Sequence, residues 1–583
     1  MLSRAHGLLL GMLRRKGSTR RKGAILVLSA ICMVFLMGLL AFAIDLGYIM
    51  TVQTELKRAT DAAALAGASQ LVQGQDAAQI EAFEFLARNP VATVNLAEDP
   101  NFEQNLQLLL AQHENEFEAE AGVWDTETRT FSTGSAYPSA LRVTAVHNNA
   151  PLFFAKVFGL DTFNVQAESI ARFQPRDIVL VLDFSASMND DSELRRIYEY
   201  GESVRETIEA NLLQIYQELG SPTYGSLPFE PEYFTQVGQP PTAPNLPQIT
   251  VTFKDREIYV TSTKDLSNVV IEYTDGSRQK FDGLSGTTGT FRGTGAYSNK
   301  KIKRCWVKSG ANSSGEGPGY GERFEDTTEN IMAAYGLDSV PYPYPSGSWS
   351  SYINYVKNGY YIKKAGYRKQ YGMMTLINYW LEQKPEYSQT PDLWMVSEQP
   401  VKQLKDAVGL FFDFIQEVNT NDRVGLVVYN SEDQTALIEH HLTDNFSLVE
   451  DTVTHRQAGH YDRYTNIGAG LSDAIDELLA NARPGAFKMI VLMTDGRANR
   501  PYSSSYARSY VLNQAQRAAD NHFPIFAISM GLGADHSLMA DVAEISEGRH
   551  FPITGGATVN DYSDDLIQAF REIADHRPLV LVK

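Results

Sequence analysis

Five oxygen-bearing side chains in the 583-residue chain have the types and spacing of ligands for a hard divalent cation. Asp183, Ser185 and Ser187 alternate within one short segment, so a carboxylate and two hydroxyls can converge on a single ion. Thr465 and Asp495 follow much later in the chain. Oxygen ligands of this kind suit Mg²⁺, with Mn²⁺ or Ca²⁺ as alternatives. The competing interpretation is that these residues are ordinary helix caps and turn formers.

The segments that precede these residues predict a doubly wound, parallel α/β sheet. Ile178–Leu182 is a continuous aliphatic run that ends at Asp183, and Met489–Met493 is a similar run that ends shortly before Asp495. Such runs are typical of central strands that are covered on both faces. Further runs and amphipathic helical patterns alternate along the chain, at residues 424–429 and 525–528 for strands and 401–418, 467–482, 506–521 and 538–545 for helices. Ligands bind at the carboxyl edge of such a sheet, so we expect the five side chains to meet there.

Three segments together resemble the metal-ion-dependent adhesion site of von Willebrand factor A (VWA) domains: Asp183-Phe-Ser185-Ala-Ser187, Thr465-Asn-Ile-Gly and Met493-Thr-Asp495-Gly. The segment from Asp422 to Val428 is similar to the second strand of that family, and the resemblance spans residues 177–188 and about 400–575. It implies that the Ser and Thr hydroxyls bind the cation and that the two Asp residues hold it directly or through water. It also implies an open coordination position, which an acidic residue of a protein partner completes.

A long insertion, residues 189–400, interrupts the predicted domain of residues 176–583. Alternating runs at 249–253, 269–273 and 301–307 predict strands, with a hairpin turn at Asp275-Gly276, so the insertion is expected to be β-rich. Residues 335–380 hold ten tyrosines and two tryptophans, which indicate either a partner-binding surface or packing onto the main domain. The first helix of the main domain is expected near Val401, with Leu194–Leu219 as the alternative. The insertion begins directly after the predicted ligands of residues 183–187. We therefore expect it to control access to the open coordination position of the cation.

The N-terminus predicts a membrane anchor. Residues 1–22 carry seven Lys and Arg residues and no acid, and residues 23–44 carry no charge at all. A span of that length crosses a bilayer as a helix, and the basic flank predicts a cytoplasmic N-terminus with the bulk of the chain periplasmic or extracellular. The alternative is a cleaved secretory signal that ends near Ala41-Phe-Ala43. Helix-forming residues continue to Leu71.

This N-terminal part resembles the TadE/TadG-like proteins of tight-adherence (Flp) pilus assembly. The resemblance is carried by Arg21-Lys-Gly23, Asp45-x-Gly47-Tyr48 and Asp61-Ala-Ala-Ala-Leu-Ala-Gly-Ala68. It implies a pilin-like protein of the inner membrane with pilus components as partners. Residues 45–175 fit an extracytoplasmic α+β region of that type, because helical patterns at 77–89 and 101–112 precede strand patterns at 140–146 and 163–169.

Net charge argues against nucleic-acid binding, and the motifs argue against a serine hydrolase. The net charge of −19 argues against nucleic-acid binding, which depends on clustered Lys and Arg. Cys32 lies inside the apolar stretch and Cys305 lies in a distant polar segment, so we expect no disulfide between them. A serine hydrolase is an alternative that draws on the histidines of the same half, but no nucleophile-elbow motif accompanies them: His440, His441, His455 and His460. The sequence therefore predicts a non-enzymatic interaction protein, with a purely structural pilus component carrying a vestigial metal site as the other alternative.

Overall fold

The computed structural model describes residues 22–583, except residues 93, 99–100, 127, 136–137, 239–246, 311–320, 384–391, 418–419, 430–435, 460–463 and 555–561. The chain divides into two compact units. Unit 1 comprises residues 1–174 with 578–583, and unit 2 comprises residues 175–577. The predicted basic segment lies outside the described residues, apart from Lys22.

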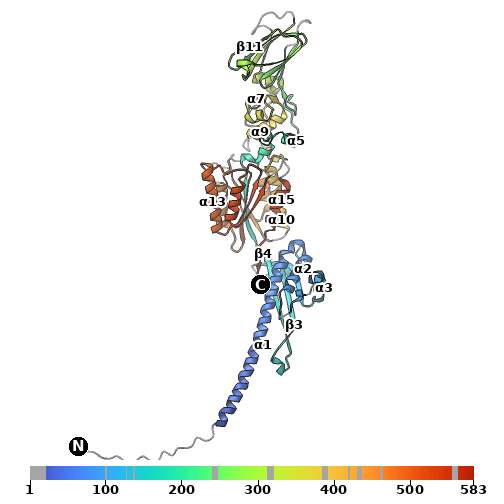
Figure 1. Ribbon diagram of the computed structural model, residues 1–583, viewed down its shortest axis with the longest axis vertical. Coiled ribbons are helices and arrows are strands. Elements are labelled where there is room, and N and C mark those ends of the chain that lie inside the picture. The colour runs from blue at the N-terminus through green and yellow to red at the C-terminus, as the bar shows by residue number, and fades with distance from the viewer. Residues whose placement is uncertain are drawn as a thin grey trace, which may run out of the picture. The chain divides into compact units, whose positions relative to one another are not determined.

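A single long helix, α1 (Lys22–Ser69), begins unit 1, as the sequence predicts (Figure 1). Its apolar N-terminal half is exposed and is long and apolar enough to cross a membrane. From Val52 onward the helix buries a face of small and apolar residues against the rest of the unit. At Gly67 a Cβ atom would lie 2.7 Å from the Cβ of Ala82, so the absence of a side chain lets α2 (Gln75–Arg88) approach closely.

The rest of unit 1 is a five-stranded antiparallel sheet that packs on α1. Its strand order is β2-β1-β3-β4-β21, with bounds Thr130–Thr133, Phe117–Asp125, Ala140–Pro151, Thr162–Phe173 and Leu579–Leu581. A third helix, α3 (Phe102–Gln112), packs beside α2. Asp61 of the Ala-rich motif accepts a hydrogen bond of 2.7 Å from the Ser169 hydroxyl and pairs with Lys57, which ties α1 to β4. The predicted helices and strands of this α+β region are therefore present.

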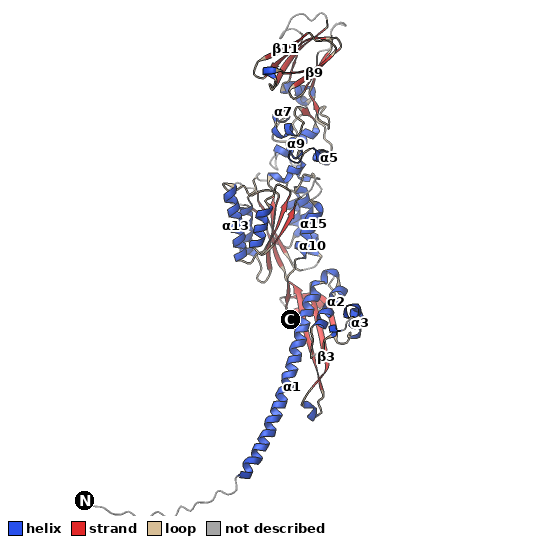
Figure 2. Cartoon of the chain, viewed as in Figure 1, coloured by secondary structure: helices blue, strands red, loops and turns tan. Residues whose placement is uncertain are grey.

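Unit 2 is built around a six-stranded sheet of order β17-β16-β5-β18-β19-β20 (Figure 2). The strands span Leu437–Thr443, Arg423–Tyr429, Arg176–Asp183, Phe487–Thr494, Ile525–Met530 and Arg549–Ile553. All neighbours are parallel except the edge pair β16 and β17. Every residue of β5 is buried, because the strand lies at the centre of the sheet and helices cover both of its faces.

The helices form one layer on each face of this sheet. Alternate residues of β5 point into two separate cores: Leu180 packs with one helix layer and Val181 with the other. Figure 1 shows α10 and α15 on one side and α13 on the other. The first layer holds α10 (Val401–Gln416), α11 (Phe446–Thr454) and α15 (Ser563–Asp575). The second holds α12 (Ile467–Asn481), α13 (Ser504–Asp520) and α14 (His536–Ile545). The predicted doubly wound fold is confirmed.

The insertion leaves the sheet after β5 and returns just before α10. It holds two four-stranded sheets, β11-β10-β13-β14 and β12-β9-β8-β7, and the pair β15-β6. The strands span Glu232–Tyr233 (β6), Thr235–Val237 (β7), Ile249–Phe253 (β8), Glu257–Ser262 (β9), Leu266–Tyr273 (β10), Arg278–Asp282 (β11), Thr288–Arg292 (β12), Ile302–Ser309 (β13), Glu322–Glu325 (β14) and Gln370–Tyr371 (β15). The hairpin turn at Asp275-Gly276 joins β10 to β11 as predicted.

Six α-helices accompany these strands in the described part of the insertion, and sequence analysis named none of them as insertion helices. They span Arg195–Tyr200 (α4), Arg205–Glu218 (α5), Thr328–Ala334 (α6), Trp349–Asn358 (α7), Tyr360–Lys364 (α8) and Met373–Gln383 (α9). The tyrosines and tryptophans of residues 335–380 pack mainly against one another in the insertion's own core, rather than onto the sheet. Helix α5 belongs to that core and α10 covers the sheet, so the first helix of the α/β domain begins at Val401.

Candidate metal centre

The structure brings all five predicted ligands to the carboxyl edge of the six-stranded sheet. Strand β5 ends at Asp183 and its parallel neighbour β18 ends at Thr494, one residue before Asp495. Because the two strands run side by side in the same direction, the two carboxylates emerge at the same edge. Ser185 and Ser187 follow β5, and Thr465 lies just before α12.

Hydrogen bonds link the side chains into one continuous chain. The Thr465 hydroxyl donates to the Ser185 Oγ at 3.3 Å, and the Ser185 and Ser187 Oγ atoms are 3.1 Å apart. The Ser187 hydroxyl donates to Asp495 Oδ1 at 2.8 Å. Asp183 stands behind this chain and accepts hydrogen bonds of 2.8 Å each from the Ser185 backbone N–H and the Thr494 hydroxyl. The oxygens therefore converge on one small volume.

Three residues that sequence analysis did not single out hold the site in place. Thr494 fixes the rotation of the Asp183 carboxylate. Asn499 binds the Thr465 segment twice, because its Oδ1 accepts from Thr465 N–H and its own N–H donates to the Thr465 carbonyl, both at 3.0 Å. Tyr429 donates to the Met493 carbonyl at 2.6 Å and lies beside Asp183. Of the three, only Thr494 directly precedes a predicted ligand in the sequence, so only it had a local signal.

Gly496, which follows Asp495, matters for space rather than for backbone conformation. Its backbone is not in the left-handed region, so the turn after Asp495 does not require glycine for its conformation. A Cβ atom there would instead lie 3.2 Å from the Thr465 Oγ1 and 3.5 Å from the Ser187 Oγ. The glycine therefore allows close approach, because a side chain here would crowd the Thr465 hydroxyl and touch the Ser187 hydroxyl.

The two carboxylates lie in an environment that disfavours their charge. Asp183 is fully buried and Asp495 nearly so. Burial raises the pKa of Asp183 to about 6, and burial together with the Asp183 charge raises the pKa of Asp495 well above its ordinary value. Within the described residues neither carboxylate forms a salt bridge. A positive charge at this edge would remove that penalty, which is what a bound cation supplies.

The donor set fits a hard cation that is held largely by hydroxyls. The site offers three hydroxyl oxygens and two carboxylates, and oxygen ligands of this kind suit Mg²⁺, Mn²⁺ or Ca²⁺. Nowhere among the described residues do three or more His, Cys, Asp or Glu side chains gather in a way that could hold a metal ion. Zinc and other metals that prefer nitrogen or sulfur ligands therefore fit this edge poorly.

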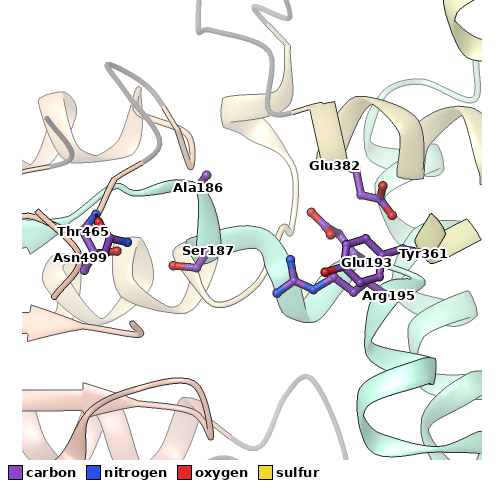
Figure 3. A pocket seen from close by; sticks show the side chains of 8 residues that line it. All are labelled: Ala186, Ser187, Glu193, Arg195, Tyr361, Glu382, Thr465 and Asn499. Carbon is purple, nitrogen blue, oxygen red and sulfur yellow. Dashed lines mark hydrogen bonds between the residues drawn. The ribbon is translucent and has the colours of Figure 1, made fainter. Parts of the chain in front are cut away.

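A pocket of about 320 Å³ opens beside the candidate ligands (Figure 3). One wall comes from the sheet edge and contains Ser187, Thr465 and Asn499. The opposite wall comes from the insertion, and it consists of Glu193, Arg195, Tyr361 and Glu382. Whatever approaches the exposed side of Ser187 therefore lies against residues of the insertion.

The histidines of the hydrolase alternative have other partners. His440 bonds to the Thr452 hydroxyl and His441 to the Glu477 carboxylate, both at 2.6 Å. His455 bonds to the Asp451 carbonyl, while His460 lies outside the described residues. A serine does stand between two histidines elsewhere, because Ser529 Oγ is 2.7 Å from both His536 and His550, but its side chain is fully buried.

Comparison with family models agrees with the architecture. Residues 394–563 match the model of the von Willebrand factor type A domain. Residues 23–70 match the TadE/G-like family of Flp pilus assembly, and residues 61–171 match a Tad-like Flp pilus-assembly family. Domains of these kinds typically serve interaction or structure rather than catalysis. No curated protein matches the chain.

Solved structures with partial similarity include VWA domains. An aerotolerance-related membrane protein from Bacteroides fragilis is 15% identical over 30% of this chain and 90% of that chain, with a TM-score of 0.24. A von Willebrand factor type A protein from Catenulispora acidiphila is 16% identical over 30% and 37%, with a TM-score of 0.23. The SpRpn10 VWA domain is 18% identical over 30% and 88%, with a TM-score of 0.25.

The fold assignment rests on the strand order and on the family model. The family model begins at residue 394, at the end of the insertion, yet β5 with Asp183 occupies the centre of the same sheet, between β16 and β18. The insertion thus separates one strand of the domain from the rest in sequence but not in space. The chain therefore joins a TadE/G-like Flp pilus-assembly region at its N-terminus to a von Willebrand factor type A domain whose sheet β5 completes.

Proposed function

We propose that this chain is a membrane-anchored cell-envelope protein that binds a protein partner through a divalent cation, Mg²⁺ as first choice, at the carboxyl edge of its VWA domain. The Tad-like region supports a role in Flp-type pilus assembly or surface adhesion. The observation that carries the proposal is the chain of three hydroxyls that ends at the buried Asp495 and lies in front of the buried Asp183 at that edge. Mn²⁺ and Ca²⁺ are the alternative ions.

The proposed roles follow from the hydrogen bonds. Ser185, Ser187 and Thr465 present their oxygen lone pairs to the ion, and the hydrogen bonds among them give way to coordination. Asp183 stays fixed behind them by Thr494, so it holds the ion directly or through water. The cation, when bound, supplies a positive charge with an unfilled position for an acidic side chain of the partner.

The insertion is proposed to control access to that position. The junction is braced, since the Asp191 N–H donates to the Gln399 carbonyl at 3.2 Å, and the Gln399 N–H donates to the Ser192 Oγ at 2.6 Å. The Tyr562 hydroxyl from the α/β domain also bonds to Asp191. With its base fixed in this way, the insertion wall of the pocket can select among partner segments. Removal of residues 190–398 without any change in metal-dependent affinity would count against this role.

The membrane part of the proposal rests on α1. Its apolar half is a candidate membrane anchor, and the basic residues before it favour a cytoplasmic N-terminus. We therefore place the anchor in the inner membrane and both units on its periplasmic or extracellular side. A cleaved signal is the alternative, and mass spectrometry of the mature N-terminus separates the two.

The test is capture of envelope proteins by the full chain in detergent, with Mg²⁺ and with a chelator. The wild type is expected to retain a specific partner only with the metal, and Asp495→Ala is expected to lose it. Asp565→Ala is the matched control, because Asp565 is exposed on α15 and carries the same charge change. Equal retention by a folded Asp495→Ala protein would instead favour a structural pilus component with a vestigial site.

A further inference from the structure

An exposed apolar surface lies on the connection between β3 and β4 in unit 1. Five large apolar side chains face solvent there, and we call them the apolar tip: Phe153, Phe154, Val157, Phe158 and Leu160. Val157 is 85% exposed and Phe158 is 84% exposed, which is more than any large apolar residue described on α1 from Leu26 onward. Large side chains that gather in this way on one short segment indicate an interaction surface rather than scattered exposure.

The tip is fastened to α1 by one buried carboxylate. Asp45 accepts hydrogen bonds from three consecutive backbone N–H groups, at 2.9 Å from Phe153, 3.0 Å from Phe154 and 2.7 Å from Ala155. These groups lead into a short 3₁₀ helix, Ala155–Phe158. Asp45 is only 5% exposed, so the contact is closed to solvent.

Aromatic packing strengthens the same contact. The ring of Tyr48 lies 5.0 Å from that of Phe153 and 5.8 Å from that of Phe163, both in edge-on arrangements. Figure 1 shows the β3 hairpin running beside α1 toward the N-terminal half of the helix. These contacts hold the tip beside residues 45–48 of α1.

The tip is bound at Asp45, which directly follows the uncharged stretch of α1. Residues 23–44 carry no charge and Asp45 is the first charged residue after them. A helix that crosses a bilayer places the end of such a stretch at the membrane surface. Segments that expose Phe and Leu side chains beside a lysine bury the apolar side chains at that interface, while the ammonium group stays in the headgroup layer. The exposed Lys156 lies within the tip and meets this condition.

We propose that the apolar tip inserts into the membrane surface beside α1 and forms a second, shallow membrane contact of unit 1. This inference rests on the proposed membrane anchoring by α1. A single helix leaves a domain free to tilt and rotate about its anchor, whereas a second contact fixed to the same helix restrains it. The occupant of the surface is the lipid of the leaflet that α1 leaves, rather than a second copy or another protein.

The test measures the membrane depth of single fluorescent labels on the full chain in lipid nanodiscs. Native Cys32 lies in the apolar half of α1 and is exposed, whereas Cys305 is buried and does not react. The Cys32→Ser/Val157→Cys protein places an environment-sensitive label on the tip. The Cys32→Ser/Leu108→Cys protein is the matched control, because Leu108 is 59% exposed on α3, away from Asp45.

Quenching by spin-labelled lipids distinguishes the outcomes. We expect the label at position 157 to lose most of its emission to a shallow quencher, the label at Cys32 to a deep quencher, and the label at position 108 to neither. A quenched Cys32 label with an unquenched 157 label would overturn the inference and leave the anchor intact. If neither is quenched, the anchoring itself fails. A signal at position 157 that follows protein concentration instead of lipid would assign the tip to a second copy and also overturn the inference.

Discussion

The two ends of strand β5 carry buried acidic residues in opposite electrostatic surroundings. At its amino end, Asp177 is fully buried and binds Arg423 at 2.9 Å and Arg483 at 2.7 Å. The neighbouring Arg176 pairs with Asp422 at 2.6 Å, and both side chains are almost completely buried. At its carboxyl end, Asp183 and Asp495 form no salt bridge among the described residues.

The pKa values follow this difference. Burial pushes the pKa of Asp177 upward, but the hydrogen bonds and charges of its two arginines outweigh burial and leave the pKa below its ordinary value. At Asp183 burial prevails and raises the pKa to about 6. At the amino end, the protein's own arginines balance the buried charge of Asp177. At the carboxyl end, no basic side chain among the described residues balances Asp183 and Asp495, so balance there requires an added positive charge. That contrast distinguishes carboxylates whose charge the protein balances itself from carboxylates that the proposed function assigns to a bound cation.

The largest effect is expected from breaking the completed end. Asp422→Asn leaves the buried Arg176 guanidinium without its counter-charge, and we expect the free energy of unfolding to fall by about 3–5 kcal/mol. The midpoint of denaturant unfolding of the VWA domain, followed in the full chain, measures this. A loss as small as that of a surface substitution would show that the arginine finds other compensation, for example from the carbonyls of residues 573, 574 and 576.

The same change at the other end is expected to have the opposite sign. Asp183→Asn removes a buried charge that has no basic partner, so the metal-free protein should gain roughly 1–3 kcal/mol above pH 6. The sign follows from proton binding. Between pH 3.8 and about 6 the folded carboxyl holds a proton that the unfolded one has lost, so wild-type stability falls as the pH rises through this range.

Unfolding of Asp183→Asn and the wild type at pH 4 and pH 7, both in chelator, tests this prediction. The gain should be small at the lower pH and full at the higher one. Added Mg²⁺ should reverse the order, because it stabilises only the wild type, by about 2.7 kcal/mol at one hundred times its dissociation constant. An Asp183→Asn protein that is less stable than the wild type in chelator would contradict the comparison.

The smallest effect is expected from removing one of the two arginines that contact Asp177 while the other stays in place. Arg483→Ala removes one of two arginines from Asp177, and the Arg483 side chain is 27% exposed. Since Arg423 remains, the loss should be about 1 kcal/mol. Thermal unfolding of the full chain provides the measurement. A loss comparable with that of Asp422→Asn would mean that the two arginines act as one unit.

Sequence alone predicted the α/β fold because its strands are continuous aliphatic runs. The run before Asp183 and the run before Asp495 can be recognised without knowing their neighbours, and their direction fixes which end the carboxylates occupy. The convergence of Thr465 followed from its place before an amphipathic helix. These are local patterns, and local patterns survive a long insertion.

Local patterns did not predict the side chains that support the candidate metal ligands, nor the Arg–Asp pairs at the amino end of β5. Asn499 and Thr494 act on ligands that are tens or hundreds of residues away in sequence. The arginine cluster had a signal that went unused, since Arg176-Asp177 and Asp422-Arg423 are charged pairs that directly precede buried strands. Charges at such positions are expected to find partners across the sheet.

The shortest helices of the insertion and the apolar tip were not predicted, for different reasons. Helices such as α4 and α8 are only six and five residues long, too short to show a periodic pattern. The tip lies between two strands and resembles an ordinary apolar connection. Only its exposure and its attachment to Asp45 distinguish it, and both are properties of the folded chain.

The most direct test of the central claim is calorimetric titration of Mg²⁺ and Mn²⁺ into the full chain in detergent. The account predicts saturable binding at one site by the wild type and by Asp565→Ala, and no binding by the double variant Asp183→Ala/Asp495→Ala. Near-ultraviolet circular dichroism establishes that each protein is folded. Absence of binding by a folded wild type, or equal binding by the double variant, would contradict a metal centre at this edge.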